Sequence, residues 1–363
     1  DNFPCMSPLR RRRTVKIMVG KVPIGGNAPV SVQTMTKTDT RDVKSTVKQI
    51  QSVAALGCDI IRVAVPDMAA AKAIKMIKQA IEIPLIADIH FDYRLAIAAL
   101  EAGADAIRIN PGNIGGKEKV REVVKAAVDY KSAIRVGVNS GSLEKDILKK
   151  YKGSEADALV ESAIRHVKFI EDLGFSHIKI SVKASDPMTT VQAYMMLAKK
   201  TDYPFHVGVT EAGTFLPGLV RSSFAIGMLL WHGIGDTIRV SLTDTPEKEI
   251  KAGLEILRAV GIRHDSTSVI SCPTCGRVQV DVAAIAGKVE ELLEKYYKEM
   301  PNAPRPKVAV MGCMVNGPGE AKEADIGIAG GIHEALLFKK GKIIRKIAED
   351  KIVSELLKEI EKM

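Results

Sequence analysis

The segment His177-Ile178-Lys179-Ile180-Ser181-Val182-Lys183 alternates polar and β-branched apolar side chains without interruption. Successive side chains of a β-strand point to opposite faces, so this pattern predicts a strand with one apolar and one polar face. In a parallel sheet packed under helices, the apolar face is the one that the helices cover. The polar face, with Lys179 and Lys183, is therefore expected to line an interior.

Seven further β-rich runs occur in the same part of the chain, and each is followed by an amphipathic, helical pattern. They cover residues 30–35, 59–65, 84–90, 105–110, 133–139, 204–210 and 237–242. Repeated βα units are typical of a parallel sheet. Eight such units predict an α/β fold of the TIM (β/α)8 barrel type, with a doubly wound open sheet as the alternative.

Polar residues occupy the inward positions of the other strands too. The cations at these positions are Arg62, Arg108, Arg135, Lys179, Lys183 and Arg239. The neutral groups on the same faces are Asn110, Asn139, Ser181, His206 and Ser241, and the acids are Asp88, which lies next but one to His90, and Glu211. A TIM barrel interior is ordinarily filled with branched apolar side chains, so this one is unusual.

This excess of inward cations predicts an anionic ligand, because unpaired buried charges cost several kcal/mol each. Arginine presents a planar fork that suits phosphate oxygens, so a phosphate or diphosphate ester is the expected occupant. The alternative is that acids from elsewhere in the sequence pair with these cations, or that the cations reach out to the rim.

Composition limits the remaining classes of function. The chain has 363 residues, 46% hydrophobic and 26% charged, with a formal net charge of +10, which excludes wholesale disorder. No apolar run reaches the ~18 residues of a membrane span. Aromatic residues make up only 4% and the patterned cations lie inside the predicted barrel, so a nucleic-acid partner is not expected. The five cysteines are an odd count, which favours a reduced, cytoplasmic protein over a disulfide framework.

Three of these cysteines form a pattern in the last quarter of the chain. Cys272 and Cys275 make a CxxC motif, and Cys313 follows in Met311-Gly-Cys-Met-Val-Asn-Gly-Pro-Gly-Glu320. A thioredoxin-type site would not need the third cysteine, and zinc would require a fourth Cys or His nearby. Three thiolates and a displaceable oxygen ligand suit a [4Fe-4S] cluster with one iron reserved for chemistry. Glu320 is the candidate for that ligand, and the alternative is a solvated glutamate at a helix start.

The cysteine pattern also suggests a domain boundary. We expect a tail over residues 1–14, whose basic run Arg10–Arg13 is solvated, a barrel over 15–264 and an iron-sulfur domain over 265–363. The last domain is predicted as α+β. Its expected elements are a short strand before Cys272, a helix over 280–299, strands at 307–311, 325–329 and 342–347, and a helix over 352–362.

Seven motifs together resemble one enzyme family. They are SVQTMTKTDTRD (31–42), IADIHFD (86–92), IRINPGN (107–113), RVGVNSGSLE (135–144), HVGVTEAG (206–213), CPTCGR (272–277) and MGCMVNGPGE (311–320). In this order they are similar to the 4-hydroxy-3-methylbut-2-enyl diphosphate synthase family of the non-mevalonate isoprenoid pathway, also called GcpE or IspG. The resemblance covers the chain from about Thr14 to its end, and the length suits the compact bacterial form.

The resemblance implies a reductive ring opening. 2-C-methyl-D-erythritol 2,4-cyclodiphosphate would take up two electrons and lose water to give 4-hydroxy-3-methylbut-2-enyl diphosphate. The family's [4Fe-4S] cluster would be held by Cys272, Cys275, Cys313 and Glu320, and ferredoxin or flavodoxin would supply the electrons. The family also implies a homodimer in which the cluster domain of one chain covers the barrel of the other.

The resemblance also gives roles to the inward residues. The cations Arg62, Arg108, Arg135, Lys179 and Arg239 would neutralise the diphosphate, with further contacts from Asn110, Asn139, Ser181, Lys183, His206 and Ser241. Glu211, Asp88 and His90 would carry out the proton transfers. Asn316 would lie near the substrate or the cluster.

Two other classes of protein share some of these features. One is a zinc-stabilised binding protein whose cationic pocket only holds a phosphorylated metabolite. The other is a pterin-type transferase barrel with an appended electron-transfer domain. Anaerobically purified protein separates the first from an iron-sulfur enzyme, because a zinc protein is colourless.

Overall fold

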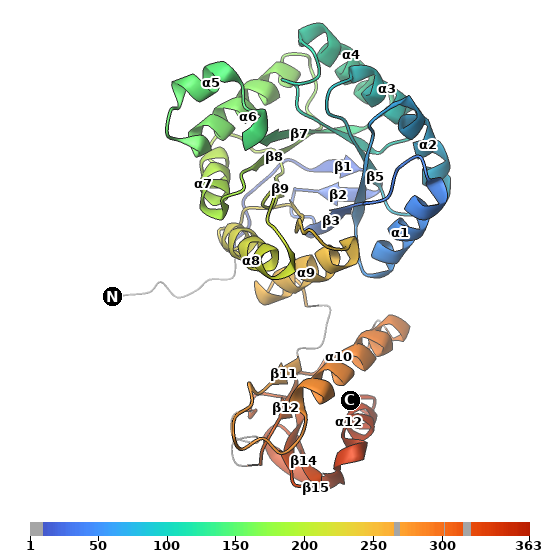
Figure 1. Ribbon diagram of the computed structural model, residues 1–363, viewed down its shortest axis with the longest axis vertical. Helices are drawn as coiled ribbons and strands as arrows, with labels where there is room; N and C mark the ends of the chain where they lie inside the picture. The colour runs from blue at the N-terminus through green and yellow to red at the C-terminus, as the bar shows by residue number, and fades with distance from the viewer. Residues whose placement is uncertain (1–9, 265–268, 301, 315–320) are drawn as a thin grey trace. The chain divides into compact units, whose positions relative to one another are not determined.

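The computed structural model describes residues 10–264, 269–300, 302–314 and 321–363. The chain divides into two units, Asp1–Ile262 and Arg263–Met363. The first holds an eight-stranded sheet of parallel strands and the second a five-stranded mixed sheet (Figure 1). Among the described helices, none is both long and apolar enough to cross a membrane.

The first unit is a ring of parallel strands, as predicted. The strands are β3 (Ser31–Met35), β4 (Ile60–Ala64), β5 (Leu85–Asp88), β6 (Ala106–Ile109), β7 (Ala133–Asn139), β8 (Ile178–Lys183), β9 (His206–Val207) and β10 (Thr237–Ile238). They follow the order β8-β7-β6-β5-β4-β3-β10-β9, and a bridge between Ile180 and Phe205 joins the two ends. The closed ring confirms the TIM barrel over the open sheet. β9 and β10 are shorter than their apolar runs predicted.

Helices surround this ring and bury the outward face of each strand (Figure 1). They are α1 (Val43–Ala55), α2 (Met68–Gln79), α3 (Tyr93–Glu101), α4 (Lys117–Asp129), α6 (Glu155–Glu171), α7 (Pro187–Leu197), α8 (Phe215–Trp231) and α9 (Pro246–Ala259), with the short α5 (Lys145–Lys150) before α6. Ile61, Val63, Ile107 and Ile178 belong to the core that strands and helices share, which is the face that the period-2 pattern predicted for them.

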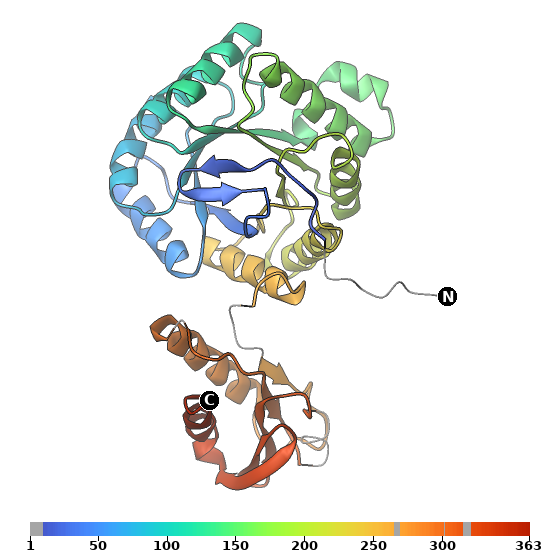
Figure 2. The same ribbon diagram turned by 180° about the vertical axis from the view of Figure 1, so that it is seen from behind.

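A hairpin that the sequence did not predict closes the amino-terminal end of the barrel. It consists of β1 (Ile17–Val19) and β2 (Val22–Ile24), and it lies across the ring in the rear view (Figure 2). Its apolar side chains pack on Ile60, Ile86 and Ala106 at the start of their strands. In this barrel, the apolar side chains that ordinarily fill the interior are therefore confined to the amino-terminal end.

The basic run before this hairpin is not a solvated tail, so that expectation was wrong for two of its residues. Arg11 pairs with Asp236 at 3.1 Å, and Arg12 donates to the backbone oxygen of Tyr203 at 2.6 Å. The Arg12 guanidinium also lies 4.1 Å from the centre of the Phe205 ring. A carboxylate, carbonyl groups and an aromatic face at the foot of the barrel compensate these cations, which the local pattern did not reveal.

In its described residues, the second unit is a five-stranded mixed sheet with two α-helices, in agreement with the predicted α+β domain. Its elements are β11 (Val269–Ser271), α10 (Val282–Glu299), β12 (Val308–Met311), β13 (Ile326–Gly331), β14 (Glu334–Lys339), β15 (Lys342–Ala348) and α12 (Ile352–Ile360). The strands follow the order β11-β12-β13-β14-β15, with the first three parallel and the last two antiparallel. β14 was not predicted.

Candidate functional site

One row of charged residues crosses four neighbouring strands of the barrel. Asp88, Arg108, Arg135 and Lys179 are consecutive partners in the parallel register of β5, β6, β7 and β8. Register partners in a sheet point to the same face, so these four side chains enter the same space. Each residue is at least 94% buried, because the strands and the basal hairpin enclose it.

Asp88 is the acid at the centre of this row. Its carboxylate lies 3.3 Å from Arg108 Nη1, 3.7 Å from Arg62 Nε and 3.6 Å from His90 Nε2. Burial acts to raise the pKa of Asp88, but Arg62, His90 and Arg108 outweigh it and hold that pKa far below its usual range. Asp88 is therefore ionised at neutral pH, which suits it better as a fixed counter-charge than as a proton donor.

Two cations of the row lack such compensation. Within the described part of the chain, Lys179 Nζ and both Nε and Nη1 of Arg135 have no hydrogen-bond partner. Burial, and secondly the neighbouring Arg135, lowers the pKa of Lys179 to about 7. Burial also lowers the pKa of Arg135, together with repulsion from Arg62 and Arg108. The interior is thus short of negative charge, as expected for an anion site without its anion.

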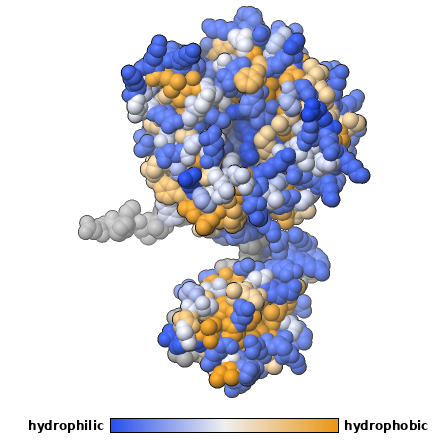
Figure 3. Space-filling model, viewed as in Figure 1, coloured by the Kyte–Doolittle hydropathy of each residue, from blue (hydrophilic) through white to orange (hydrophobic). Residues whose placement is uncertain are grey.

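Above this row lies an open cavity of about 390 Å³ at the carboxyl ends of the strands. It is lined by His90, Arg108, Asn110, Asn139 and Glu211, which were predicted, and by Asn113, Ser140, Gly141, Ser142 and Ser185 from the βα loops, which were not. Thr210 also lines it. The surface at this end of the barrel is largely hydrophilic (Figure 3). In TIM barrels the loops at this end carry the active site.

The other predicted contacts lie deeper or to one side. Ser181, Lys183 and His206 are buried in the barrel wall, and Arg239 and Ser241 follow the end of β10. His206 Nδ1 shares a hydrogen bond of 2.7 Å with Thr237 Oγ1. Burial, and then the nearby Lys183, holds the pKa of His206 well below its usual range, so its imidazole is neutral.

Glu211 lies at the rim of the cavity in a strained conformation. Its backbone φ is +52°, a value that residues other than glycine seldom adopt. Ser185 Oγ donates a hydrogen bond of 2.9 Å to Glu211 Oε2, so the carboxylate is oriented by a neighbouring loop. Strain of this kind is concentrated at functional sites, where surrounding structure maintains it.

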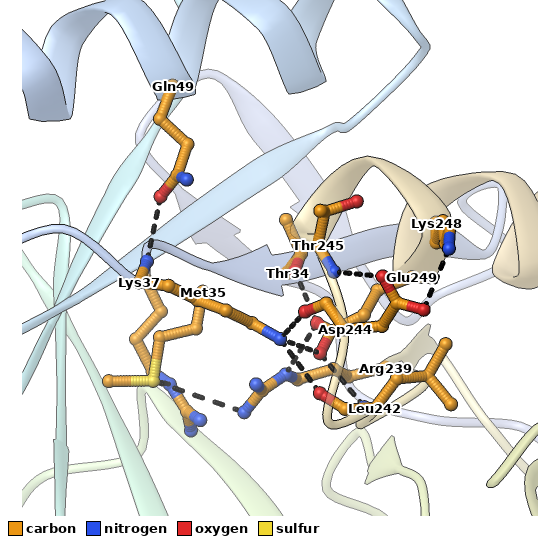
Figure 4. Close-up of polar contacts among 11 residues, drawn as sticks. Thr34, Met35, Lys37, Gln49, Arg239, Leu242, Asp244, Thr245, Lys248 and Glu249 are labelled. Atoms are coloured by element: carbon orange, nitrogen blue, oxygen red, sulfur yellow. Dashed lines mark hydrogen bonds and ion pairs between the residues drawn. The ribbon is translucent and has the colours of Figure 1, made fainter. Parts of the chain in front are cut away.

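Two residues that position the cations were not predicted from the period-2 pattern. One is an acid on a helix outside the strands, and the other is a strand glycine that leaves space for a neighbouring side chain. Glu249 in α9 is 1% exposed and contacts both Arg239 and Lys37 (Figure 4). It is an acid of the kind that the salt-bridge alternative required. Gly137 leaves room for Arg108, since a Cβ there would lie 2.5 Å from Arg108 Nε. Neither residue is an inward-pointing cation on a strand, so the strand pattern does not indicate them.

In the second unit, two cysteine loops start from adjacent parallel strands. Ser271 at the end of β11 is the partner of Val310 in β12, so Cys272 and Cys313 both follow the carboxyl ends of neighbouring strands. Gly312 N donates a hydrogen bond of 3.2 Å to Cys272 Sγ, and Cys275 directly precedes the turn at residues 276–277 of the loop that follows β11. An amide donor to sulfur is what a metal-bound thiolate accepts.

The remaining predicted residues of this site, Asn316 and Glu320, lie outside the described residues. Among those that are described, no three His, Cys, Asp or Glu side chains already form a metal-binding group.

Comparisons with known proteins place both units in one family. A family model described as the GcpE TIM-barrel domain matches residues 14–254, and one described as the GcpE protein C-terminal domain matches residues 268–362. The 4-hydroxy-3-methylbut-2-en-1-yl diphosphate synthase (flavodoxin) of Ruminiclostridium cellulolyticum is 54% identical over 98% of this chain and 99% of its own length. The protein of the same name from Caldanaerobacter subterraneus is 56% identical over 97% and 98%.

Among solved structures, the barrel resembles a type I 3-dehydroquinate dehydratase from Clostridium difficile. The TM-score is 0.51 at 14% identity, over 68% of this chain and 98% of that one. At this identity the likeness concerns the barrel fold alone.

Proposed function

This chain belongs to the GcpE family of iron-sulfur oxidoreductases, and we propose how its residues divide the family's reaction. In that reaction 2-C-methyl-D-erythritol 2,4-cyclodiphosphate is converted reductively into 4-hydroxy-3-methylbut-2-enyl diphosphate. The barrel cations bind the diphosphate, residues at the rim move protons, and the cysteine loops hold the metal centre.

Unpaired cations inside the barrel are the observation that carries the substrate site. Arg135 and Lys179 are buried without hydrogen-bond partners among the described residues, beside Arg62 and Arg108, which share the single carboxylate of Asp88. A diphosphate would supply the missing negative charge and accept several charge-assisted hydrogen bonds at once. In this proposal Lys183, Arg239, Asn110, Asn139, Ser181, His206 and Ser241 make the further contacts.

The residues at the rim are proposed for the proton transfers. Glu211 lines the cavity and is oriented by Ser185, so it is the first candidate for the acid or base. His90 also lines the cavity and lies 3.6 Å from Asp88, which would orient its ring. Asp88 then acts through its charge rather than through its proton. Asn316 is proposed to lie near the substrate or the metal centre.

For the metal centre we propose a [4Fe-4S] cluster held by Cys272, Cys275, Cys313 and Glu320. The donor set fits, because three thiolates stand on loops that start from adjacent strands and one of them already accepts an amide hydrogen bond. When bound, the cluster supplies electrons and a Lewis-acidic iron. The carboxylate of Glu320 would be the ligand that gives way to substrate oxygen.

Anaerobic purification tests this cluster. The wild-type protein is expected to be brown and to contain about four iron atoms per chain, whereas Cys272→Ser should lose the colour and the turnover together. Cys58→Ser is the matched control and should leave the iron content unchanged, because Cys58 is buried in the connection between α1 and β4 of the barrel. A colourless wild-type protein that holds one zinc would refute the proposed cluster.

The electron donor is proposed to be flavodoxin, since the relatives carry that word in their names, with ferredoxin as the alternative small carrier. A reduced, cytoplasmic setting suits a site that depends on three thiolates. The donor is tested by measuring turnover with each reduced carrier in turn. Turnover supported by neither carrier would contradict this assignment.

We further propose an N-terminal segment over residues 1–14, of which Arg11 and Arg12 pack on the barrel, a barrel over 15–264 and a cluster domain over 265–363. We propose that the chain works as a homodimer in which each cluster domain covers the partner's barrel. An exposed apolar stripe formed by Leu216, Val220 and Phe224 at four-residue spacing on α8 supports an association between copies.

Mixed dimers test this arrangement. A chain with Cys313→Ser and a chain with Arg108→Ala are each expected to be inactive, and mixing them should restore part of the activity. One of the two sites in a mixed dimer would then combine an intact barrel with an intact cluster domain. No recovery in dimers shown to be mixed would indicate a site formed within one chain.

A further inference from the structure

Glu249 is a buried acid that the reaction as described does not use. It is the fourth residue of α9, and only 1% of it is exposed. A carboxylate is rarely so deeply buried unless cations and hydrogen-bond donors surround it. Its partners show what this burial achieves.

Both oxygens of Glu249 are engaged, and their partners come from two different strand ends (Figure 4). Oε2 accepts a hydrogen bond of 2.6 Å from Thr34 Oγ1 and lies 3.6 Å from Arg239 Nε. Oε1 accepts a hydrogen bond of 3.0 Å from Leu242 N and lies 3.3 Å from Lys37 Nζ. One carboxylate thus connects the end of β3, the end of β10 and the start of α9.

Arg239 depends on this carboxylate for its orientation. Among the described residues, its Nε faces Glu249 as an ion pair without a hydrogen bond, and its Nη1 donates to Met35 Sδ at 4.0 Å. The side chain is only 14% exposed, and its guanidinium lies between the Glu249 carboxylate and the Met35 sulfur (Figure 4). A guanidinium fixed in this way binds an anion without first losing rotamer freedom.

Lys37 fastens the two loops around the same point. Its Nζ donates to the backbone oxygen of Leu242 at 2.8 Å and to that of Asp244. The loop that follows β3 is therefore tied to the loop that follows β10, next to Arg239. This tie keeps the Glu249 carboxylate close to its guanidinium partner.

We propose that Glu249 is a positioning residue for the diphosphate: it holds Arg239 in the orientation that binds an anion and touches no substrate atom itself. This inference rests on the proposed diphosphate site in the barrel. It assigns to a helix residue outside the strand ring a role in substrate affinity.

The sign of one substitution separates this role from a simple effect of charge. Glu249→Gln removes one negative charge near the pocket, so the field alone predicts tighter binding of an anion. If Glu249 positions Arg239, the same change weakens binding, because the amide no longer holds the guanidinium. We expect about tenfold weaker binding, because the guanidinium would then lose rotamer freedom when it binds the anion.

The experiment measures the affinity of the full-length, anaerobically prepared protein for inorganic diphosphate by calorimetry, and KM and kcat for the cyclodiphosphate. Glu249→Gln should raise the Kd and the KM by a similar factor, with a much smaller change in kcat. Glu255→Gln, an exposed position on the same helix, is the matched control and should change neither constant. Thr34→Val removes a hydrogen bond to Oε2 but leaves the ion pair, so it should lower the melting temperature without changing the Kd.

A double-mutant cycle completes the test. In an Arg239→Ala background, Glu249→Gln should weaken diphosphate binding no further, because the residue that it positions is gone. Unchanged or tighter binding in Glu249→Gln alone, or an equal loss in both backgrounds, would overturn the proposal. A separate result would be that Arg135→Met binds diphosphate with the wild-type Kd. That outcome would refute the proposed diphosphate site itself rather than the role of Glu249.

Discussion

At the scale of single residues, the unusual feature is Lys179, a buried lysine whose Nζ has no hydrogen-bond partner among the described residues. Burial lowers the pKa of Lys179 to about 7, against 10.5 for the free side chain. Between these two values the unfolded chain binds more protons than the folded one, so the contribution of Lys179 to stability rises with pH across that window. Lys179 therefore lowers the free energy of unfolding most at and below neutral pH.

Lys179→Met should therefore stabilise the protein near pH 7, by about 1 kcal/mol or more, because it removes a charge that is buried without a partner. The gain should shrink as the pH rises toward 10. Diphosphate binding should weaken at the same time, since the pocket loses a cation. Urea unfolding at pH 7 and at pH 9 measures the difference, with Lys199→Met, at an exposed position just after α7, as control. A destabilised variant at pH 7 would show that Lys179 has a partner in the free protein.

Asp88 presents the opposite case, because it is the acid that two buried arginines share. Asp88→Asn would leave Arg62 and Arg108 without their counter-charge, and a broken buried pair costs about 3–5 kcal/mol. We expect a lower free energy of unfolding at pH 7, part of which bound diphosphate restores. Denaturant unfolding with and without diphosphate tests this, and Glu118→Gln in an exposed pair is the control. A loss that diphosphate does not reduce would separate Asp88 from the anion site.

At the scale of elements, strand β7 shows how a glycine makes room for a neighbouring side chain. A Cβ at Gly137 would lie 2.5 Å from Nε and 3.3 Å from Cζ of Arg108 on β6. Gly137→Ala should therefore displace the guanidinium from Asp88 and cost about 1–3 kcal/mol, as overpacking does. Diphosphate affinity should fall as well.

The matched control for Gly137→Ala is Gly227→Ala in α8, where the added Cβ would lie 3.9 Å from the nearest atom. A helix interior favours alanine over glycine by about 1 kcal/mol, so this variant should be more stable and bind normally. Thermal unfolding and calorimetry measure both variants. Normal diphosphate binding in Gly137→Ala would mean that Arg108 tolerates displacement or does not contact the anion.

At the scale of the whole molecule, the two units carry separable parts of the chemistry. The cations belong to residues 62–239 and the cysteines to residues 272–313, so each set can be removed without touching the other. Cys272→Ser is expected to lose iron yet bind diphosphate with the wild-type Kd. Arg135→Met should keep its iron and bind diphosphate at least about tenfold more weakly. Loss of both properties in either variant would contradict this division.

The sequence was sufficient for features that depend on near neighbours in the chain. The alternation in residues 177–183 and in the other strands predicted eight strands and their inward cations, because side-chain direction along a strand repeats every two residues. The CxxC spacing likewise grouped Cys272 with Cys275. The roles of these residues in binding and catalysis stay predictions that the experiments above address.

Features that depend on distant parts of the chain required the folded molecule. Glu249 meets Thr34 across 215 positions, and Arg11 meets Asp236 across 225, so no local pattern could pair them. In the sequence, Glu249 cannot be distinguished from a solvated acid on an amphipathic helix. Only closure of the ring brings α9 beside β3, the first strand of the barrel. Local periodicity set which way each side chain points, and ring closure set which charges meet, because the energy of an ion pair depends on distance in space and not along the chain.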